Sequence, residues 1–162
     1  DAHGFVVNKD LFEKYDIPLP TDYESFVSAC QAFDQVGIRG FTADYYYDYT
    51  CMETLQGLSA SELSSVEGRK WRTAYSDPDN TKREGLDSTV WPEAFERMEQ
   101  FIQDTGLSQD DLDMNYDDIV EMYQSGKLAM YFGSSAGVKC FRIRASTQRF
   151  FHSFRRTVKS GL

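Results

Sequence analysis

The sequence has 162 residues, 41% of them apolar and 15% aromatic, which is enough to build a hydrophobic core and too apolar for a disordered chain. It contains no run of about 18 apolar residues that could span a membrane, and no signal-peptide pattern opens it. The formal charge is −9, but residues 1–139 carry 11 basic and 26 acidic residues, a charge of −15, which makes nucleic acid a poor partner.

Hydrophobic periodicity and turn residues predict an alternation of short strands and helices. The first segment already has the pattern of a strand, so we expect the chain to start inside a larger fold. The predicted elements are a strand over 4–7, a helix over 9–15, a helix from 21 to 36, a strand over 40–43, helices over 50–58, 60–66, 91–105 and 116–124, and a strand over 127–132.

The second helix has the clearest signals. Thr21 and Glu24 have the spacing of a capping box, and Gly37 supplies a stop. The positions expected to face inward are Phe26, Val27, Cys30, Phe33, Gln35 and Val36. By contrast, residues 67–87 lose periodicity around Trp71, and we expect an irregular surface segment there.

The aspartates between positions 110 and 118 and the three cysteines lack the spacing of metal ligands. Five aspartates gather between positions 110 and 118 without the glycine and terminal glutamate of a calcium loop, so we expect helix caps and solvated charge. The three cysteines have no metal-ligand spacing. A Cys30–Cys51 disulfide is compatible with the sequence, but free thiols are the favoured interpretation.

The last predicted strand runs into a small-residue turn. Leu128, Met130 and Phe132 alternate with smaller or polar-tipped residues, and Gly133, Ser134 and Ser135 follow. We expect Gly133 to adopt turn angles and the serines to cap a helix, so that N–H groups and hydroxyls gather beyond the carboxyl end of the strand. Ligands bind at that place in open α/β sheets, although a plain strand-to-helix turn has the same pattern.

The order of these segments resembles the family 1 extracellular solute-binding proteins, the sugar receptors of bacterial ABC importers. The residues that carry the resemblance are Gly4-Phe-Val-Val-Asn-Lys-Asp-Leu-Phe12, Pro20-Thr-Asp-Tyr-Glu-Ser-Phe26, Gly40-Phe-Thr-Ala43 and Gly126 to Ser135. Together they cover residues 4–139. No single piece is diagnostic, and the resemblance rests on their order and spacing.

The resemblance implies an α/β fold of the periplasmic-binding-protein type II, in which two lobes clamp a sugar. This chain corresponds to the helical part of the second lobe, predominantly helical with a few short strands, without the first lobe, export signal or lipid-anchor cysteine. The implied partners are a carbohydrate and the membrane permease subunits of the transporter, with no cofactor or metal. The implied location is extracellular, lipid-anchored in the full-length protein, or periplasmic. An exposed lobe surface can also favour a homo-oligomer.

Residues 140–162 change composition abruptly, with six basic residues and no acid. We hypothesise a frameshift, because one nucleotide string encodes a family-like continuation in one frame and Cys140 through Gly161 in the frame one base later. The 140–162 tail would then have no selected function. The alternative is a genuine basic tail for an acidic or lipid partner.

A sugar requires aromatic planes for its C–H faces and polar groups for its hydroxyls. Segment 44–48 and Trp71 offer this chemistry. The candidate ligand-binding residues are Asp44, Tyr45, Tyr46, Trp71, Gly133, Ser134 and Ser135. The structural alternative is that at least two of the four tyrosines between positions 45 and 49 belong to the core, and that Trp71 covers a loop.

Two other classes of protein compete with a receptor. Asp44, Asp48 and Glu53 have the chemistry of glycosidase carboxylates, but a single helical lobe supplies only one wall of the site that such a pair requires. The sequence has no nucleophile motif, phosphate loop or Cys-His metal set, and we expect no catalytic residues and no enzyme activity. The third class is a helical protein-interaction module with an exposed apolar half-cleft.

Overall fold

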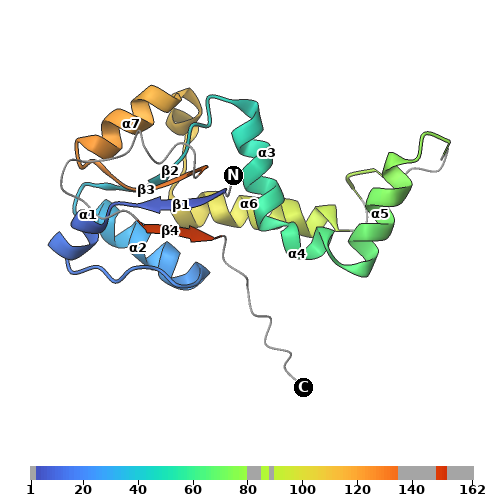
Figure 1. Ribbon diagram of the computed structural model, residues 1–162, viewed down its shortest axis with the longest axis horizontal. Helices are drawn as coiled ribbons and strands as arrows, with labels where there is room; N and C mark the ends of the chain where they lie inside the picture. The colour runs from blue at the N-terminus through green and yellow to red at the C-terminus, as the bar shows by residue number, and fades with distance from the viewer. Residues whose placement is uncertain (1–2, 80–84, 88–89, 135–148, 153–162) are drawn as a thin grey trace, which may run out of the picture. The chain divides into compact units, whose positions relative to one another are not determined.

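The computed structural model describes residues 3–79, 85–87, 90–134 and 149–152 (Figure 1). The strands are β1 (His3–Val7), β2 (Arg39–Thr42), β3 (Leu128–Ser134) and β4 (Arg149–His152). The helices are α1 (Lys9–Lys14), α2 (Tyr23–Gln35), α3 (Asp48–Leu58), α4 (Ala60–Leu63), α5 (Val66–Ser76), α6 (Trp91–Thr105) and α7 (Tyr116–Gln124), with a 3-10 helix η1 (Gln109–Asp113). The predominantly helical α/β character expected from the sequence is confirmed.

The chain folds as two compact units. Unit 1 comprises residues 1–50 and 104–162, and unit 2 comprises residues 51–103. The division falls within α3 and within α6, so unit 2 consists of α4 and α5 with most of those two helices. Unit 1 holds the described strands, with α1, α2, η1 and α7 gathered around them (Figure 1). The proposed boundary between residues 139 and 140 stays a prediction.

The sheet of unit 1 has the strand order β2-β3-β1-β4. β1 pairs antiparallel with β3 and with β4, whereas β2 pairs parallel with β3. Segment 149–152 therefore adds a strand beside β1, although it lies in the basic tail.

Aromatic rings join α2 to the sheet. The ring of Phe26 lies 4.9 Å from that of Phe5 and 5.4 Å from that of Phe41, and Phe5 lies 5.9 Å from Phe132 across the β1–β3 pair. Aromatic pairs of this kind contribute stability beyond the area that they remove from water. The inward positions predicted for Phe26, Cys30 and Phe33 are confirmed, since each is fully buried. Val36 is exposed, because the helix has ended by that residue.

The N-terminus of α2 differs by one residue from the prediction. The N-cap is Asp22, whose carboxylate accepts a hydrogen bond from Ser25 N at 2.8 Å. The hydroxyl of Ser25 in turn accepts from Asp22 N at 3.1 Å, so the capping box is formed by this pair and not by Thr21 and Glu24. The hydrogen bonds from the Ser25 side chain and backbone hold the pKa of Asp22 below its usual value.

A close backbone contact lies beneath α2. A Cβ atom at Gly40 would stand 2.5 Å from Cys30 Cα and 2.6 Å from the Cys30 carbonyl oxygen, so only glycine allows this approach. Cys30 is fully buried at this contact, and burial raises the pKa of its thiol to about 12. The two described cysteines, Cys30 and Cys51, are not in a disulfide, as the sequence favoured.

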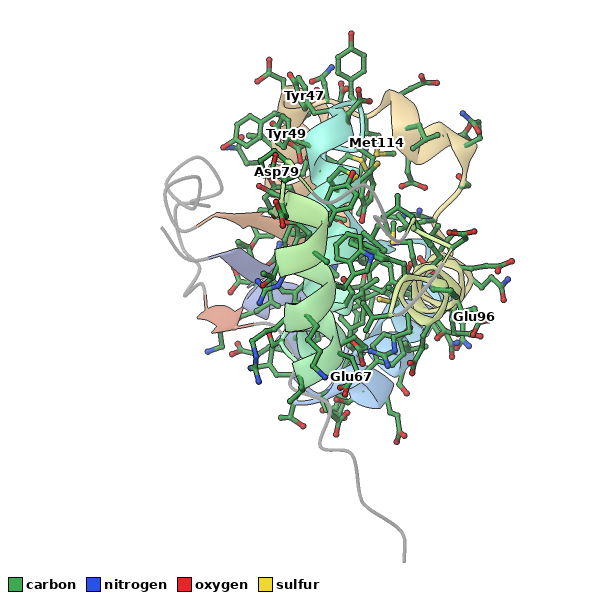
Figure 2. All side chains as sticks on the ribbon, turned by 90° about the vertical axis from the view of Figure 1, so that its right-hand side faces the viewer. Tyr47, Tyr49, Glu67, Asp79, Glu96 and Met114 are labelled. Atoms are coloured by element: carbon green, nitrogen blue, oxygen red, sulfur yellow. The ribbon has the colours of Figure 1, made fainter. Side chains whose placement is uncertain are left out.

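Unit 2 corrects the prediction for residues 67–87, because its first half is helix α5. Ser65 caps this helix by accepting from Gly68 N at 3.0 Å. The helical pattern of α5 is hard to recognise in the sequence because Gly68, a residue type that disfavours helices, stands in its first turn. Glycine is needed there because a Cβ atom would collide with the carbonyl oxygen of Glu62. Figure 2 shows the unit 2 helices with their side chains. Their buried cluster consists of Leu55, Trp71, Trp91 and Ala94.

An arginine connects the helices of unit 2. The guanidinium of Arg97 on α6 contacts the carboxylate of Glu62 at 2.5 Å and that of Glu93 at 2.9 Å, and it donates to the Leu58 carbonyl. Burial of Glu62 opposes its ionisation, but hydrogen bonds from Arg97 and Ser61 hold the pKa of this carboxyl below its usual value. The described helices are each too short or too polar to cross a bilayer.

We predict that Gly40→Ala lowers the free energy of unfolding by about 1–3 kcal/mol, because the added methyl group forces β2 away from α2. Gly57→Ala is the matched control, since nothing lies within 4 Å of a Cβ there and alanine favours helix α3 by up to about 1 kcal/mol. Urea unfolding of both variants tests this. Equal stability of the two would contradict the close contact.

Candidate functional site

The parallel pairing of β2 with β3 determines where the candidate residues lie. Thr42 stands opposite Tyr131 in this pairing, so the two strands end at the same edge of the sheet. The segment that follows β2 begins at Ala43, beside the last residues of β3. Asp44, Tyr45 and Tyr46 are therefore brought to the same edge as Gly133 and Ser134. This is the edge where α/β sheets bind ligands.

Asp44 connects the end of β2 to the start of α3. Its carboxylate is buried, with 7% of the residue exposed, and accepts a hydrogen bond from Thr50 Oγ1 at 3.0 Å. Its carbonyl oxygen accepts from Tyr47 N at 3.1 Å, and the carbonyl of Tyr47 accepts from Thr50 N at 3.0 Å. Asp44 thus fixes the conformation of segment 44–50, and its side chain presents little surface to solvent.

Three tyrosines of this segment are exposed. Tyr46, Tyr47 and Tyr49, which we call the tyrosine cluster, are exposed by 61%, 36% and 56%, whereas Tyr45 is buried. The expectation that at least two of the four belong to the core is wrong, because only Tyr45 is buried. Sequence reasoning selected Tyr45 and Tyr46 and missed Tyr47 and Tyr49. The signal in the sequence that could have pointed to Tyr47 and Tyr49 is the run of tyrosines itself.

The rings of the tyrosine cluster contact one another. Tyr47 and Tyr49 are stacked, with centroids 5.4 Å apart and an interplanar angle of 19°, and Tyr46 meets Tyr47 edge-on at 5.2 Å. Tyr47, Tyr49 and Met114 lie at the same end of unit 1 (Figure 2). The cluster therefore offers adjoining aromatic surface and hydroxyl groups, which suits a ligand with apolar faces and a polar rim.

Gly133 belongs to strand β3 and not to a turn. It pairs with Gly4 of β1, and the ring of Tyr131 occupies the space where a Cβ would stand. Glycine is therefore required at position 133 because the buried ring of Tyr131 approaches closely. The expectation that Gly133 adopts turn angles is wrong, since the residue lies in a strand. Ser134 is the last residue of the strand, and Ser135 lies outside the described residues.

Trp71 lies in α5 of unit 2 and is buried. Its ring stacks on Tyr75 at 4.8 Å and meets Trp91 edge-on at 5.2 Å. With only 8% of the residue exposed, Trp71 is a core residue that offers no open ring face for a sugar. The expectation of a stacking plane in a surface loop assumed an irregular segment that is in fact a helix.

Four of the five aspartates between positions 110 and 118 are exposed, and one, Asp111, is buried. Asp118 accepts from Asn115 N in the capping box of α7, as expected, and is exposed. Asp111 also closes a capping box, with Ser108, but it is 2% exposed and contacts Arg39 at 2.6 Å. Solvated charge is therefore the wrong description of Asp111. Within the described ranges no group of His, Cys, Asp and Glu side chains is arranged to hold a metal ion.

Comparison with solved structures identifies the fold. The match to a chitin oligosaccharide binding protein covers 93% of this chain and 36% of that protein, at 15% identity and a TM-score of 0.73. The match to a sugar transporter from Bacillus licheniformis in complex with stachyose covers 96% of this chain and 41% of that protein, at 12% identity and a TM-score of 0.68. The match to a family 1 extracellular solute-binding protein from Bifidobacterium longum subsp. infantis covers 85% of this chain and 34% of that protein, at 15% identity and a TM-score of 0.61.

No protein-family model and no curated protein matches the sequence. The chain has the periplasmic-binding-protein-like fold of the extracellular solute-binding proteins, which confirms at the level of the fold the resemblance inferred from sequence. It spans about a third to two-fifths of the length of these structures. The three structures named above are described as a binding protein, a sugar transporter and a solute-binding protein.

We predict that Thr50→Val lowers the free energy of unfolding by about 1–3 kcal/mol, because it leaves the buried Asp44 carboxylate without the Thr50 hydrogen bond. The control is Thr73→Val on α5, where the lost hydroxyl bond to Arg69 O is exposed and a small change is expected. Thermal or urea unfolding measures both. Indistinguishable stabilities would argue against the anchoring role of Asp44.

Proposed function

We propose that the chain is part of the carbohydrate receptor of an ABC importer and that the tyrosine cluster contacts the sugar. The observation that carries the proposal is this exposed aromatic cluster, which lies at the carboxyl end of β2 in a solute-binding fold. Neighbours named for chitin oligosaccharide and for stachyose support a carbohydrate ligand.

The proposed site divides its tasks between ring faces and polar groups. Tyr46, Tyr47 and Tyr49 place aromatic faces against the C–H faces of a sugar, and their hydroxyls bind its rim. Gly133, Ser134 and Ser135 stay candidates for further hydrogen bonds to the sugar, as the sequence predicted, although Ser135 lies outside the described residues. Asp44 and Tyr45 are buried and support the segment that carries the exposed rings. Trp71 is left out of the site because it is buried in unit 2.

The receptor accounts for the site better than the two competing classes. A glycosidase requires two carboxylates presented to the substrate across a cleft, whereas Asp44 is buried and bonded to Thr50. The exposed rings also suit a protein-interaction module, but nothing on this surface identifies a protein partner. As a receptor component, the chain works outside the cytoplasmic membrane, with permease subunits as partners and its exposed surface available for a homo-oligomer.

A single lobe cannot close on its ligand, because closure needs two domains that move about a hinge. We therefore expect these 162 residues alone to bind oligosaccharides with a Kd on the order of millimolar or weaker, about −4 kcal/mol. Nanomolar or low micromolar binding by this chain would contradict that expectation.

We predict that Tyr46→Ala weakens this binding about tenfold, which corresponds to about 1.4 kcal/mol of lost ring contact. Tyr46→Phe is the matched control, because it keeps the ring and should retain most of the affinity. The measurement is an NMR titration with chitooligosaccharides, xylooligosaccharides and stachyose. Equal affinity of the alanine variant and the wild type would exclude Tyr46 from the site.

For residues 140–162 we propose the frameshift origin that the sequence suggested. The test is the nucleotide sequence of the gene on both sides of the segment that encodes this chain. Resumption of a solute-binding-protein sequence in the neighbouring frame is expected. An undisturbed frame that continues into a conventional domain would overturn the proposal and leave the basic tail as a functional segment.

A further inference from the structure

The carboxylate of Asp111 is a buried junction between η1 and β2. Its Oδ2 accepts from Arg39 Nη2 at 2.6 Å and from Ser108 N at 2.7 Å, and its Oδ1 accepts from Thr42 Oγ1 at 2.8 Å. Two of these donors belong to β2, and the third caps η1. Because charge-assisted hydrogen bonds are short and directional, this carboxylate fixes the position of η1 relative to the strand.

The C-terminal end of η1 holds the tyrosine segment. Met114, the residue after η1, accepts a hydrogen bond from Tyr46 N at 3.1 Å through its carbonyl oxygen. Met114 N donates to the carbonyl oxygen of Asp111 at 3.3 Å, and the sulfur of Met114 lies 3.9 Å from Thr42 Oγ1. A short chain of contacts thus leads from the Asp111 carboxylate to the backbone of Tyr46.

The ring of Tyr46 depends on this backbone contact for its place. The residue is 61% exposed, and its ring meets Tyr47, which is itself exposed. Burial in the core therefore does little to orient it. The position of the ring follows from where residues 44–46 are held, between the Asp44–Thr50 bond on one side and Met114 on the other.

We propose that Asp111 is a positioning residue for the tyrosine cluster. Through Arg39 and Thr42 it holds η1 on β2, and through Met114 it holds the backbone of Tyr46, so that the exposed rings keep one arrangement before the ligand arrives. Such preorganisation improves binding, because less ordering remains to be done on association. The significance for sugar capture rests on the proposed function, whereas the mechanical link does not.

The alternative is that Asp111 only stabilises unit 1 as a whole. The two roles differ in what a mutation changes. A purely stabilising residue speeds hydrogen exchange at all core amides in parallel, because exchange then follows global opening. A positioning residue speeds exchange at Tyr46 N selectively, while the amides of the central strands keep their protection.

The experiment is amide hydrogen exchange by NMR on the 162-residue chain. We expect Asp111→Asn to speed exchange at Tyr46 N about tenfold relative to Asn8 N, which donates to Ala129 O between β1 and β3 and reports global opening. Asp113→Asn, an exposed charge on the same 3-10 helix, should leave the ratio unchanged. Should Asp111→Asn fail to fold, Thr42→Val removes one bond of the junction and should change the ratio in the same direction.

Parallel acceleration of Tyr46 N and Asn8 N, or no acceleration of Tyr46 N, would overturn the proposal. A chitooligosaccharide titration of the wild type and of Asp111→Asn gives a separate readout, in which we expect weaker binding by the variant. If the wild type binds no sugar while the exchange ratio changes as expected, the proposed function fails and the positioning role stands. If the wild type binds and the variant binds equally well, preorganisation by Asp111 is excluded.

Discussion

The parallel pairing of β2 with β3 is the constraint on which the arrangement of unit 1 depends. Parallel neighbours cannot be joined by a tight turn and need a long crossover connection. Here the crossover runs from Ala43 to Lys127 and includes the whole of unit 2. One consequence is that the tyrosine segment and the end of β3, more than 80 positions apart in the sequence, share one edge of the sheet.

Two buried carboxylates stabilise the segments at this edge. Asp44 and Asp111 are both largely removed from water, and each accepts a hydrogen bond from a threonine hydroxyl, that of Thr50 and that of Thr42. Burial of a charged group is costly unless hydrogen bonds or an opposite charge compensate it. Asp111 has both kinds of compensation because Arg39 contacts it. The hydrogen bonds of these two carboxylates are directional, so they define the conformation of the adjoining segments more narrowly than apolar packing alone.

Local signals in the sequence predicted most elements of unit 1. The periodic face of α2 and the stop at Gly37, whose φ is +74°, follow from a few neighbouring residues, as does Gly126 at +73° before β3. Helix α5 was missed because its polar surface and Gly68 conceal a single buried ring, that of Trp71. The role of Asp111 could not be read locally, since its partner Arg39 is 72 positions away. Likewise, the exposure of Tyr49 depends on where α3 begins.

The two tryptophans of the sequence have a spectroscopic consequence. Trp71 and Trp91 both belong to unit 2 and meet edge-on at 5.2 Å, close enough for their excited states to couple. Emission excited above 295 nm therefore reports on unit 2 alone, while tyrosine absorbance includes the rings of unit 1. The chain thus carries two intrinsic optical probes, one of them confined to a single unit, and the unfolding of the two units can be followed separately without any label.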